Sequence, residues 1–325
     1  MPAELGYALS SEEHTPSDLV RYAARAEEVG FTFAGISDHF HPWVRAQGHS
    51  PFVWGVLGAI AQRTERLRLG TGVTCPTVRT HPAIVAQAAA TAACLMPGRF
   101  FLGVGSGEAL NEHVVAQRWP PAPVRLQMLE EAVEVIRTLW KGGSQDHAGR
   151  FYTVEDATIF DLPDPLPQIV VAASGPKAAS LAARVGDGMW GTSPDPQTMD
   201  TFRREGGAGR PCYGQVTVCW ADDEDQARKT AFEVWPNAAI TGQLSQDLPT
   251  PQHFEQAAQM VTEQDVGEKL VCGPDVARHV ELVKSYVDGG YTHVYIHQVG
   301  PDQEGFFRFW ERELRPALAS EGLIG

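Results

Sequence analysis

The sequence predicts an α/β fold in which eight strand-then-helix units close into one (β/α)8 TIM barrel. Eight short apolar runs recur along the 325 residues, and amphipathic segments with helix start signals separate them. Eight such units are the number that closes a parallel barrel, whose catalytic groups lie in the loops after the strands. The fold class therefore also predicts where functional side chains should gather.

The predicted strands are short and mostly apolar, at residues 5–10, 31–37, 67–74, 100–105, 168–174, 188–192, 213–220 and 292–297. Thr15-Pro16 has the pattern of an N-cap followed by proline in the first helical turn, and Ser50-Pro51 repeats it. Gly30 suits the C-terminal end of the first helix. These signals predict helices between consecutive strands.

One stretch, residues 236–268, breaks the alternation because it is polar and contains three prolines. It holds one predicted helical piece at residues 254–261. We interpret it as an insertion near the barrel mouth, within a single domain that spans residues 1–325.

Composition limits the class of partner. A formal net charge of -14 disfavours nucleic acid, and no apolar run is long enough to span a membrane. Five scattered cysteines without a C-x-x-C pair indicate neither a disulfide framework nor a zinc site. We therefore expect a cytoplasmic protein that binds a small molecule.

Chemically capable residues follow five of the predicted strands. They are Asp38 and His39, residues 72–76, residues 103–108, residues 174–176, and Thr192 with Ser193. Because the carboxyl ends of barrel strands share one rim, we expect these groups to converge on the barrel mouth. Trp43, close to His39 in the chain, is expected to wall the pocket.

Two loops indicate a cofactor. Glycines at 103, 105 and 107 do not match a dinucleotide fingerprint, since the third falls one residue early. A tight barrel loop that lets the backbone approach a flat ligand, with Glu108 in the mouth, fits better. Residues 174–177 open a helix whose free N–H groups suit a phosphate. We interpret the site as an acid–base pair beside a planar, phosphate-bearing cofactor.

His39-x-His41 allows a second interpretation, because such a pair at a strand end can begin the binuclear site of a metal-dependent barrel hydrolase. The later strand ends supply only His297 as a further ligand, so we predict no metal. A binding barrel without catalysis is a third class. It does not need Asp38, His39 and Glu108 together.

Four segments carry a resemblance to a known family: SDHFHPW at 37–43, the run at 69–77, HPAIVAQ at 81–87, and FLGVGSGEALNE at 101–112. They resemble the luciferase-like flavin and deazaflavin superfamily, and within it the group of coenzyme F420-dependent glucose-6-phosphate dehydrogenases. The resemblance implies a bacterial-luciferase-like barrel that forms a homodimer and binds coenzyme F420, with FMN as the alternative cofactor. It also implies a non-proline cis peptide at Gly72-Val73.

Site residues follow from the same resemblance. It implies that Asp38 contacts the cofactor, that His39 exchanges a proton with the substrate oxygen, and that Glu108 is the second acid–base group. Trp43 is added to the predicted catalytic set because it stands beside His39 in the chain. The implied cofactor-binding residues are Gly72, Val73, Cys75, Ser106, Asn111, Ser174, Gly175, Lys177 and Ala178. Thr192 and Lys269 are the implied substrate-binding residues.

The substrate prediction departs from the family pattern. Sugar-phosphate-oxidising members carry lysines where this chain has Asp195 and Ser245, so only Lys269 keeps a cation. A phosphate dianion needs charge-assisted donors. We therefore predict hydride transfer between the deazaflavin and a small alcohol, carbonyl compound or activated alkene, and not glucose 6-phosphate. An FMN-dependent luciferase-like oxidoreductase or monooxygenase is the alternative within the family.

Overall fold

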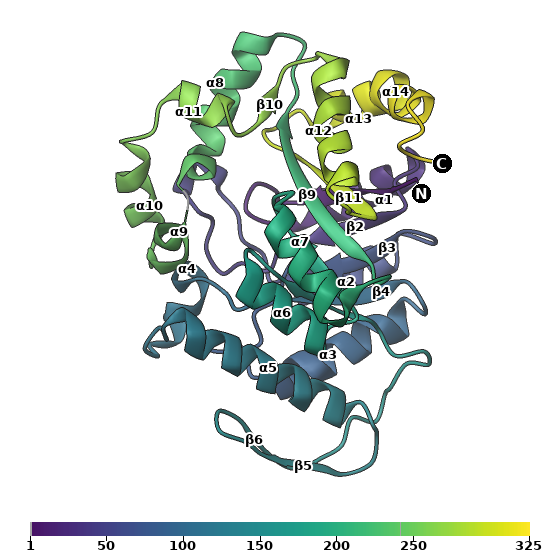
Figure 1. The fold of residues 1–325 in the computed structure, drawn as a ribbon, viewed down its shortest axis with the longest axis vertical. Helices are drawn as coiled ribbons and strands as arrows, with labels where there is room; N and C mark the ends of the chain where they lie inside the picture. Colours follow the sequence, from purple (N-terminus) through teal and green to yellow (C-terminus); the bar gives the residue numbers. More distant parts are fainter. Residues whose placement is uncertain (1, 241) are drawn as a thin grey trace.

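The computed structural model describes residues 2–240 and 242–325, and a closed ring of eight parallel strands lies at their centre (Figure 1). Neighbouring strands pair in the order β1, β2, β3, β4, β7, β8, β9 and β11, and β11 pairs with β1. The predicted barrel is confirmed, and each predicted strand overlaps an observed one. The strands are β1 (Glu4–Leu9), β2 (Phe33–Ile36), β3 (Arg68–Thr71), β4 (Phe100–Val104), β7 (Ile169–Ala172), β8 (Gly188–Gly191), β9 (Cys212–Cys219) and β11 (His293–Gln298).

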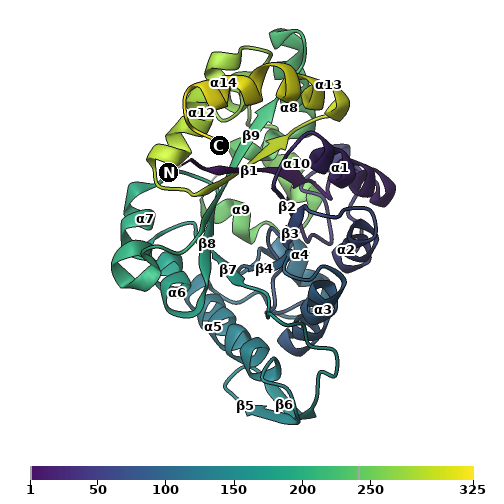
Figure 2. The ribbon, with the colours of Figure 1, turned by 90° about the vertical axis from the view of Figure 1, so that its right-hand side faces the viewer.

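Helices surround the strands on the outside of the ring (Figure 2). They are α1 (Pro16–Glu28), α2 (Val53–Ala61), α3 (Pro82–Leu95), α5 (Ala122–Leu139), α6 (Pro176–Val185), α7 (Pro196–Phe202), α8 (Glu224–Val234), α12 (Val276–Asp288), α13 (Gln303–Phe309) and α14 (Arg315–Ser320). A short helix, α4 (Ala109–Glu112), lies in the loop after β4. Within the described residues, no helix combines the length and apolar character that crossing a membrane requires.

Local signals explain the first helix and fail for the second. Thr15 caps α1 by accepting a hydrogen bond from the Asp18 N–H, and Gly30 follows the helix with a φ of 91° that favours glycine. The predicted cap at Ser50 is wrong, because α2 begins at Val53. The Ser50 hydroxyl instead donates to the His39 carbonyl at 2.8 Å. A tertiary contact has replaced the cap.

Aromatic side chains fill the barrel below its mouth. Phe33, Phe101, Trp190, Tyr213 and Tyr295 form one buried cluster with Val170, and the rings of Trp190 and Tyr213 stack with centroids 5.4 Å apart. The Trp190 indole N–H donates to the Tyr295 hydroxyl, which in turn donates to Gln215 Oε1, so the polar atoms of these two aromatic residues are paired. Because this layer closes the interior, a ligand can enter only from the mouth.

Two strand features were not predicted. An antiparallel hairpin, β5 (Gln145–Ala148) with β6 (Thr153–Ala157), projects beside α5 (Figure 1), and β10 (Val271–Cys272) pairs with β9. The hairpin sequence is largely polar, so hydrophobic periodicity does not reveal it. Its anchor is Tyr152, a buried residue whose hydroxyl donates to the Thr77 carbonyl at 3.0 Å.

The predicted insertion lies between α8 and β10, and its described residues form a 3-10 helix at Pro236–Ala239 and three short α-helices. They are α9 (Gln243–Asp247), α10 (Pro251–Ala258) and α11 (Glu263–Gly267). The helix predicted at 254–261 corresponds to α10, which begins three residues earlier because Thr250 caps it. Phe254 of α10 is fully buried, and its ring lies 5.2 Å from that of Trp43. This contact fixes the insertion at the barrel mouth.

Candidate active site

A cavity of about 380 Å³ opens at the carboxyl ends of the barrel strands. The loops after β2, β3, β4, β7 and β8 all contribute to its lining, as the barrel prediction requires. Predicted site residues that line this cavity are Asp38, His39, Trp43, Gly72, Val73, Cys75, Ser106, Glu108, Asn111, Ser174, Ala178 and Thr192. The structure thus brings together side chains from positions 38 to 192.

Three predicted residues do not line the cavity. Gly175 and Lys177 lie at the start of α6, directly after the lining residue Ser174. Lys269 is exposed beyond the end of α11, outside the lining. The structure therefore leaves Lys177 beside the site and separates Lys269 from it.

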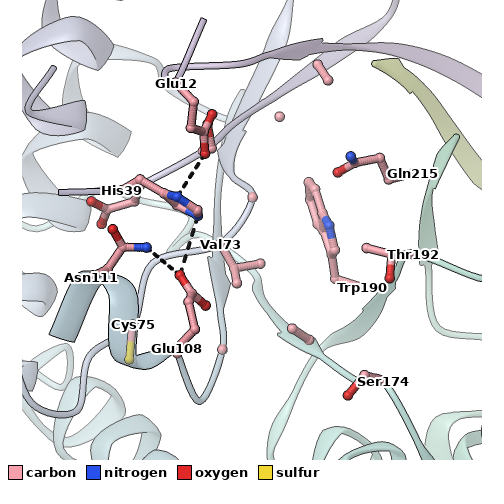
Figure 3. A pocket seen from close by; sticks show the side chains of 18 of the residues that line it. Glu12, His39, Val73, Cys75, Glu108, Asn111, Ser174, Trp190, Thr192 and Gln215 are labelled. Carbon is pink, nitrogen blue, oxygen red and sulfur yellow. Dashed lines mark hydrogen bonds and ion pairs between the residues drawn. The ribbon is translucent and has the colours of Figure 1, made fainter. Parts of the chain in front are cut away.

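His39 lies between two carboxylates (Figure 3). Its Nδ1 is 3.0 Å from Glu12 Oε1, and its Nε2 is 3.4 Å from Glu108 Oε1. The side chain of His39 is 12% exposed, so water screens these ion pairs weakly. Trp43 adds its ring in an edge-on contact, with centroids 5.0 Å apart. His39 is thus held in place on two sides and walled on a third.

Glu12 is the main site residue that sequence reasoning missed. It is 2% exposed and accepts hydrogen bonds from the hydroxyls of Ser37 at 2.7 Å and Ser10 at 3.0 Å. Burial raises the pKa of this carboxyl, but the His39 charge and the hydrogen bonds outweigh it and hold the pKa at about 2. Glu12 follows β1 by a few residues, so its place at the same rim as His39 could have identified it from the sequence as a site candidate.

His39 shows the matching shift. Burial by itself lowers the pKa of its imidazole, but the Glu12 and Glu108 carboxylates outweigh burial and raise the pKa to about 9. His39 is therefore an imidazolium at neutral pH when nothing else occupies the site. An imidazolium is a proton donor, and it becomes a proton acceptor only after it loses that proton.

Asn111 joins the loop after β4 to the loop after β2. Its amide nitrogen donates to Glu108 Oε1 at 2.5 Å, and its amide oxygen accepts from the backbone N–H groups of Phe40 and His41 at 2.8 and 3.1 Å. The side chain is 2% exposed. Asn111 therefore orients Glu108 toward His39. This structural role is additional to the cofactor contact predicted for Asn111.

Asp38 belongs to a buried network beneath these groups. Its carboxylate accepts from the Thr74 hydroxyl and from the Arg79 guanidinium, both at 2.8 Å. The other end of that guanidinium lies 3.4 Å from Glu112, whose pKa burial raises. The network links the loops after β2, β3 and β4. It fixes the backbone at the position of His39.

Small residues shape the rest of the cavity. The Gly72-Val73 peptide is cis, as the resemblance implied, and Val73 lies between the acid–base groups on one side and Trp190, Thr192 and Gln215 on the other (Figure 3). A Cβ at Gly72 would lie 2.6 Å from the Trp190 ring. The missing side chain at Gly72 thus lets the Trp190 indole pack directly against the backbone, and both residues line the cavity.

The start of α6 supplies a second part of the candidate cofactor site. Ser174 lines the cavity, and α6 begins at Pro176, so the first N–H groups of a ten-residue helix lie next to it. These groups and the positive end of the helix dipole favour an anion, and the exposed Lys177 adds a charge. The donor set fits the phosphate of a cofactor tail.

His41 does not join His39 in a metal site. Its Nδ1 lies 3.0 Å from the Leu110 carbonyl, and its ring stacks on His113 with centroids 5.8 Å apart. His297 is paired with Glu13 at 2.8 Å. In the described part of the chain no three His, Cys, Asp or Glu side chains are grouped as metal ligands. The donor geometry gives the hydrolase alternative no support.

Further lining residues were not assigned to the site from the sequence, and His297 among them was considered only as a metal ligand. They are Trp190, Gln215, Trp235, Asn237, Gln246, Tyr295 and His297. Gln215, Tyr295 and His297 lie on predicted strands, so only the orientation of their side chains was unknown. Trp235 directly follows α8, and Asn237 and Gln246 belong to the insertion, where no periodic signal exists.

The chain is similar to known proteins along nearly its whole length. The family model described as luciferase-like monooxygenase matches residues 1–293. Proteins named F420-dependent glucose-6-phosphate dehydrogenase, from Microbacterium testaceum and Mycobacterium avium, are 38% and 37% identical to this chain. The alignments cover 98% of this chain in each case and 98% and 99% of the relatives.

Solved structures extend the comparison. An F420-dependent secondary alcohol dehydrogenase in complex with an F420-acetone adduct superposes with a TM-score of 0.90 at 30% identity, covering 98% of this chain and 99% of that one. The F420-dependent tetrahydromethanopterin reductase from Methanopyrus kandleri, at 22% identity and a TM-score of 0.76, shares the fold. The resemblance read from the motifs is confirmed, and the chain belongs to the luciferase-like family.

Proposed function

We propose that this enzyme transfers a hydride between coenzyme F420 and a carbon of a small, uncharged alcohol or carbonyl compound. One observation carries the proposal. His39 is held between Glu12 and Glu108, at 3.0 and 3.4 Å, in a cavity of about 380 Å³ that Gly72, Val73 and Trp190 also line. Relatives that cover the whole chain are named as F420-dependent dehydrogenases, which supports this cofactor.

The residues that would hold the cofactor fall into two groups. Gly72, Val73, Cys75 and Ser106 would border the ring, and the start of α6 with Lys177 would bind the phosphate of the tail. When bound, a deazaflavin supplies a two-electron hydride carrier without flavin-type oxygen chemistry. This difference separates the proposal from the FMN-dependent alternative, in which the cofactor could react with oxygen.

The chain itself would move the proton. In alcohol oxidation, neutral His39 would accept the hydroxyl proton at Nε2, and in carbonyl reduction the imidazolium would donate it from the same atom. Glu12 holds the other ring nitrogen and stabilises the charged form. Glu108 would be the second acid–base group. Trp43 would exclude water from the His39 side of the cavity.

The charge of the cavity supports an uncharged substrate. Its lining contains Glu12, Asp38, Glu108 and Glu112, and no lysine or arginine among the described residues. Asp195, which stands where phosphate-binding relatives are expected to have lysine, caps α7 by accepting from the Thr198 N–H at 2.8 Å. A phosphate dianion would find no lysine or arginine donor among the described lining residues, and the His39 imidazolium is already paired with two carboxylates. We therefore exclude Lys269 from the proposed substrate site.

The first test is a binding titration of the purified, metal-free enzyme with F420 and with FMN, followed by tryptophan fluorescence, since Trp43 and Trp190 line the cavity. We expect saturable quenching by F420 and not by FMN. Reduced F420 should then be consumed with small ketones and not regenerated from its oxidised form with glucose 6-phosphate. Binding of FMN alone, or rapid turnover of glucose 6-phosphate, would contradict the cofactor or the substrate assignment respectively.

We also propose that the enzyme is a cytoplasmic homodimer. All five cysteines are unpaired thiols, which suits a reducing compartment. Helices α2 and α3 contain no charged residue, although Ala59 and Ile84 on them are exposed. Uncharged, small-residue helix faces at a protein surface favour close contact with a second copy.

A further inference from the structure

The insertion contributes two side-chain amides to the cavity. Asn237 and Gln246 both line it, and they come from the segment that connects α8 to α10. This segment lies next to the acid–base groups, because Gln47 bridges Asn237 and the backbone of Trp43. Neither amide has a role in the proton transfer described above.

The orientation of Asn237 is determined by Gln47. The Gln47 amide nitrogen donates to Asn237 Oδ1 and to the Val234 carbonyl, both at 3.1 Å, and its amide oxygen accepts from the Trp43 N–H at 2.8 Å. Gln47 is 4% exposed, so it cannot rotate freely. Because the oxygen of Asn237 is occupied by a protein donor, its NH₂ group is the part available to a ligand.

Gln246 is oriented in the same way by a buried arginine. Arg125 donates from Nη2 to Gln246 Oε1 at 2.7 Å and from Nη1 to the Pro120 carbonyl at 2.8 Å. Its guanidinium also stacks 4.3 Å from the centre of the Trp119 ring, and the residue is 2% exposed. The oxygen of Gln246 is therefore occupied as well, which leaves its NH₂ group free.

Asn237 and Gln246 offer two neutral donors in a cavity that is lined by several carboxylates and, among the described residues, by no lysine or arginine. The His39 imidazolium in the lining is already paired with Glu12 and Glu108. The two amide donors therefore define a type of ligand atom. They suit an uncharged oxygen acceptor, and they do not supply the charge that a phosphate or carboxylate needs. We infer that Asn237 and Gln246 recognise a second oxygen of the substrate, so that the preferred substrate is an uncharged alcohol or ketone with a further ether, hydroxyl or carbonyl oxygen. This inference rests on the proposed function.

Matched ketones test the inference. Methoxyacetone and 2-pentanone have the same number of heavy atoms, as do 5-methoxy-2-pentanone and 2-heptanone, and the ether oxygen can only accept a hydrogen bond. We expect wild-type enzyme with reduced F420 to show a kcat/KM at least about fivefold higher for the ether of one or both pairs, the effect of about one hydrogen bond. Two spacings are used because they place the ether oxygen at different distances from the reacting carbon.

The isosteric variants Asn237→Asp and Gln246→Glu keep the oxygen that accepts from Gln47 or Arg125 and remove the NH₂ donor. We expect each to lower kcat/KM for the preferred ether about fivefold or more, with little change for the corresponding simple ketone. Gln252→Glu adds the same charge on α10, where the side chain is exposed and does not line the cavity, and should leave the preference intact.

The outcomes separate the two levels of the proposal. If reduced F420 is consumed equally with the ether and the simple ketone of both pairs, the amide inference is overturned and the proposed function stands. Equal losses for both ketones in the amide variants would also overturn it, because a purely structural role predicts that pattern. If no ketone consumes reduced F420 although F420 binds, both the proposed reaction and the inference fail.

Discussion

In the proposed reaction, the protonation state of His39 sets which direction of proton transfer is favoured. With a pKa of about 9 the imidazole carries its proton at neutral pH, so the enzyme without ligands holds a proton donor ready for carbonyl reduction. Alcohol oxidation needs the neutral imidazole, which is the minor form at pH 7. One residue therefore makes the two directions respond to pH in opposite ways.

The pH dependence of kcat/KM tests this assignment. For alcohol oxidation, kcat/KM should rise with pH and level off near pH 9, whereas for ketone reduction it should stay flat up to about pH 9 and then fall. Glu12→Gln removes a carboxylate that raises the His39 pKa. The pH at which kcat/KM for alcohol oxidation is half its maximum should therefore fall from about 9 toward 6.5, the ordinary pKa of histidine. Glu13→Gln is the matched control, because Glu13 pairs with His297. If this midpoint pH is the same in Glu12→Gln as in the wild type, the pH dependence does not come from His39.

Substitution of the two acid–base groups gives a second prediction at this scale. His39→Ala and Glu108→Gln should each lower kcat by about 10²–10⁴-fold, the usual contribution of a positioned proton-transfer group. F420 should still bind, because both side chains lie on the proton-transfer side of the cavity, away from the start of α6. Rapid-mixing kinetics and the binding titration measure the two effects separately. Normal turnover in either variant would remove that residue from the mechanism.

At the scale of single elements, α6 is the part of the barrel that suits an anion. Its first N–H groups lie beside Ser174, and Lys177 is its only lysine. Barrels of this class often bind phosphate at the start of a helix, because backbone donors and the helix dipole act together. The contribution of Lys177 should be modest, since its side chain is exposed.

Lys177→Ala should therefore raise the Kd for F420 about two- to fivefold at low ionic strength, and the difference should shrink as salt is added. The control is Lys229→Ala, which removes the same charge from an exposed position on α8. Fluorescence titrations at two salt concentrations measure both variants. Equal Kd values for Lys177→Ala and wild type at low salt would place the cofactor tail elsewhere.

At the scale of the whole molecule, the uncharged outer faces of α2 and α3 support the homodimer. The two helices are adjacent in the barrel, and exposed Ala59 and Ile84 lie on them. A charge placed in such an interface would be desolvated without a partner. Ala59→Glu should accordingly shift the mass in multi-angle light scattering from twice 35.4 kDa toward 35.4 kDa. Ser320→Glu, on the exposed end of α14, should not. A wild-type enzyme that elutes as a monomer would contradict the proposal.

Much of the fold was predictable because its signals are local. Alternating apolar runs located the barrel strands, and Thr15 and Gly30 marked the ends of α1 through short-range hydrogen bonding and backbone conformation. The same reasoning failed at Ser50, whose hydroxyl bonds to His39, and at the polar hairpin, whose anchor is the contact of Tyr152 with Thr77. Local patterns do not record such distant partners.

Local sequence patterns were enough to predict the barrel and the residue types at its rim, because strand ends in a closed parallel barrel meet at one mouth whatever the packing details. Three-dimensional packing was needed to show that Glu12 pairs with His39, that Asn111 orients Glu108, and that Lys269 lies outside the cavity. It also decided that Asn237 and Gln246 present their NH₂ groups. These outcomes depend on side-chain directions and on contacts between residues far apart in the chain, which packing selects and periodicity does not encode.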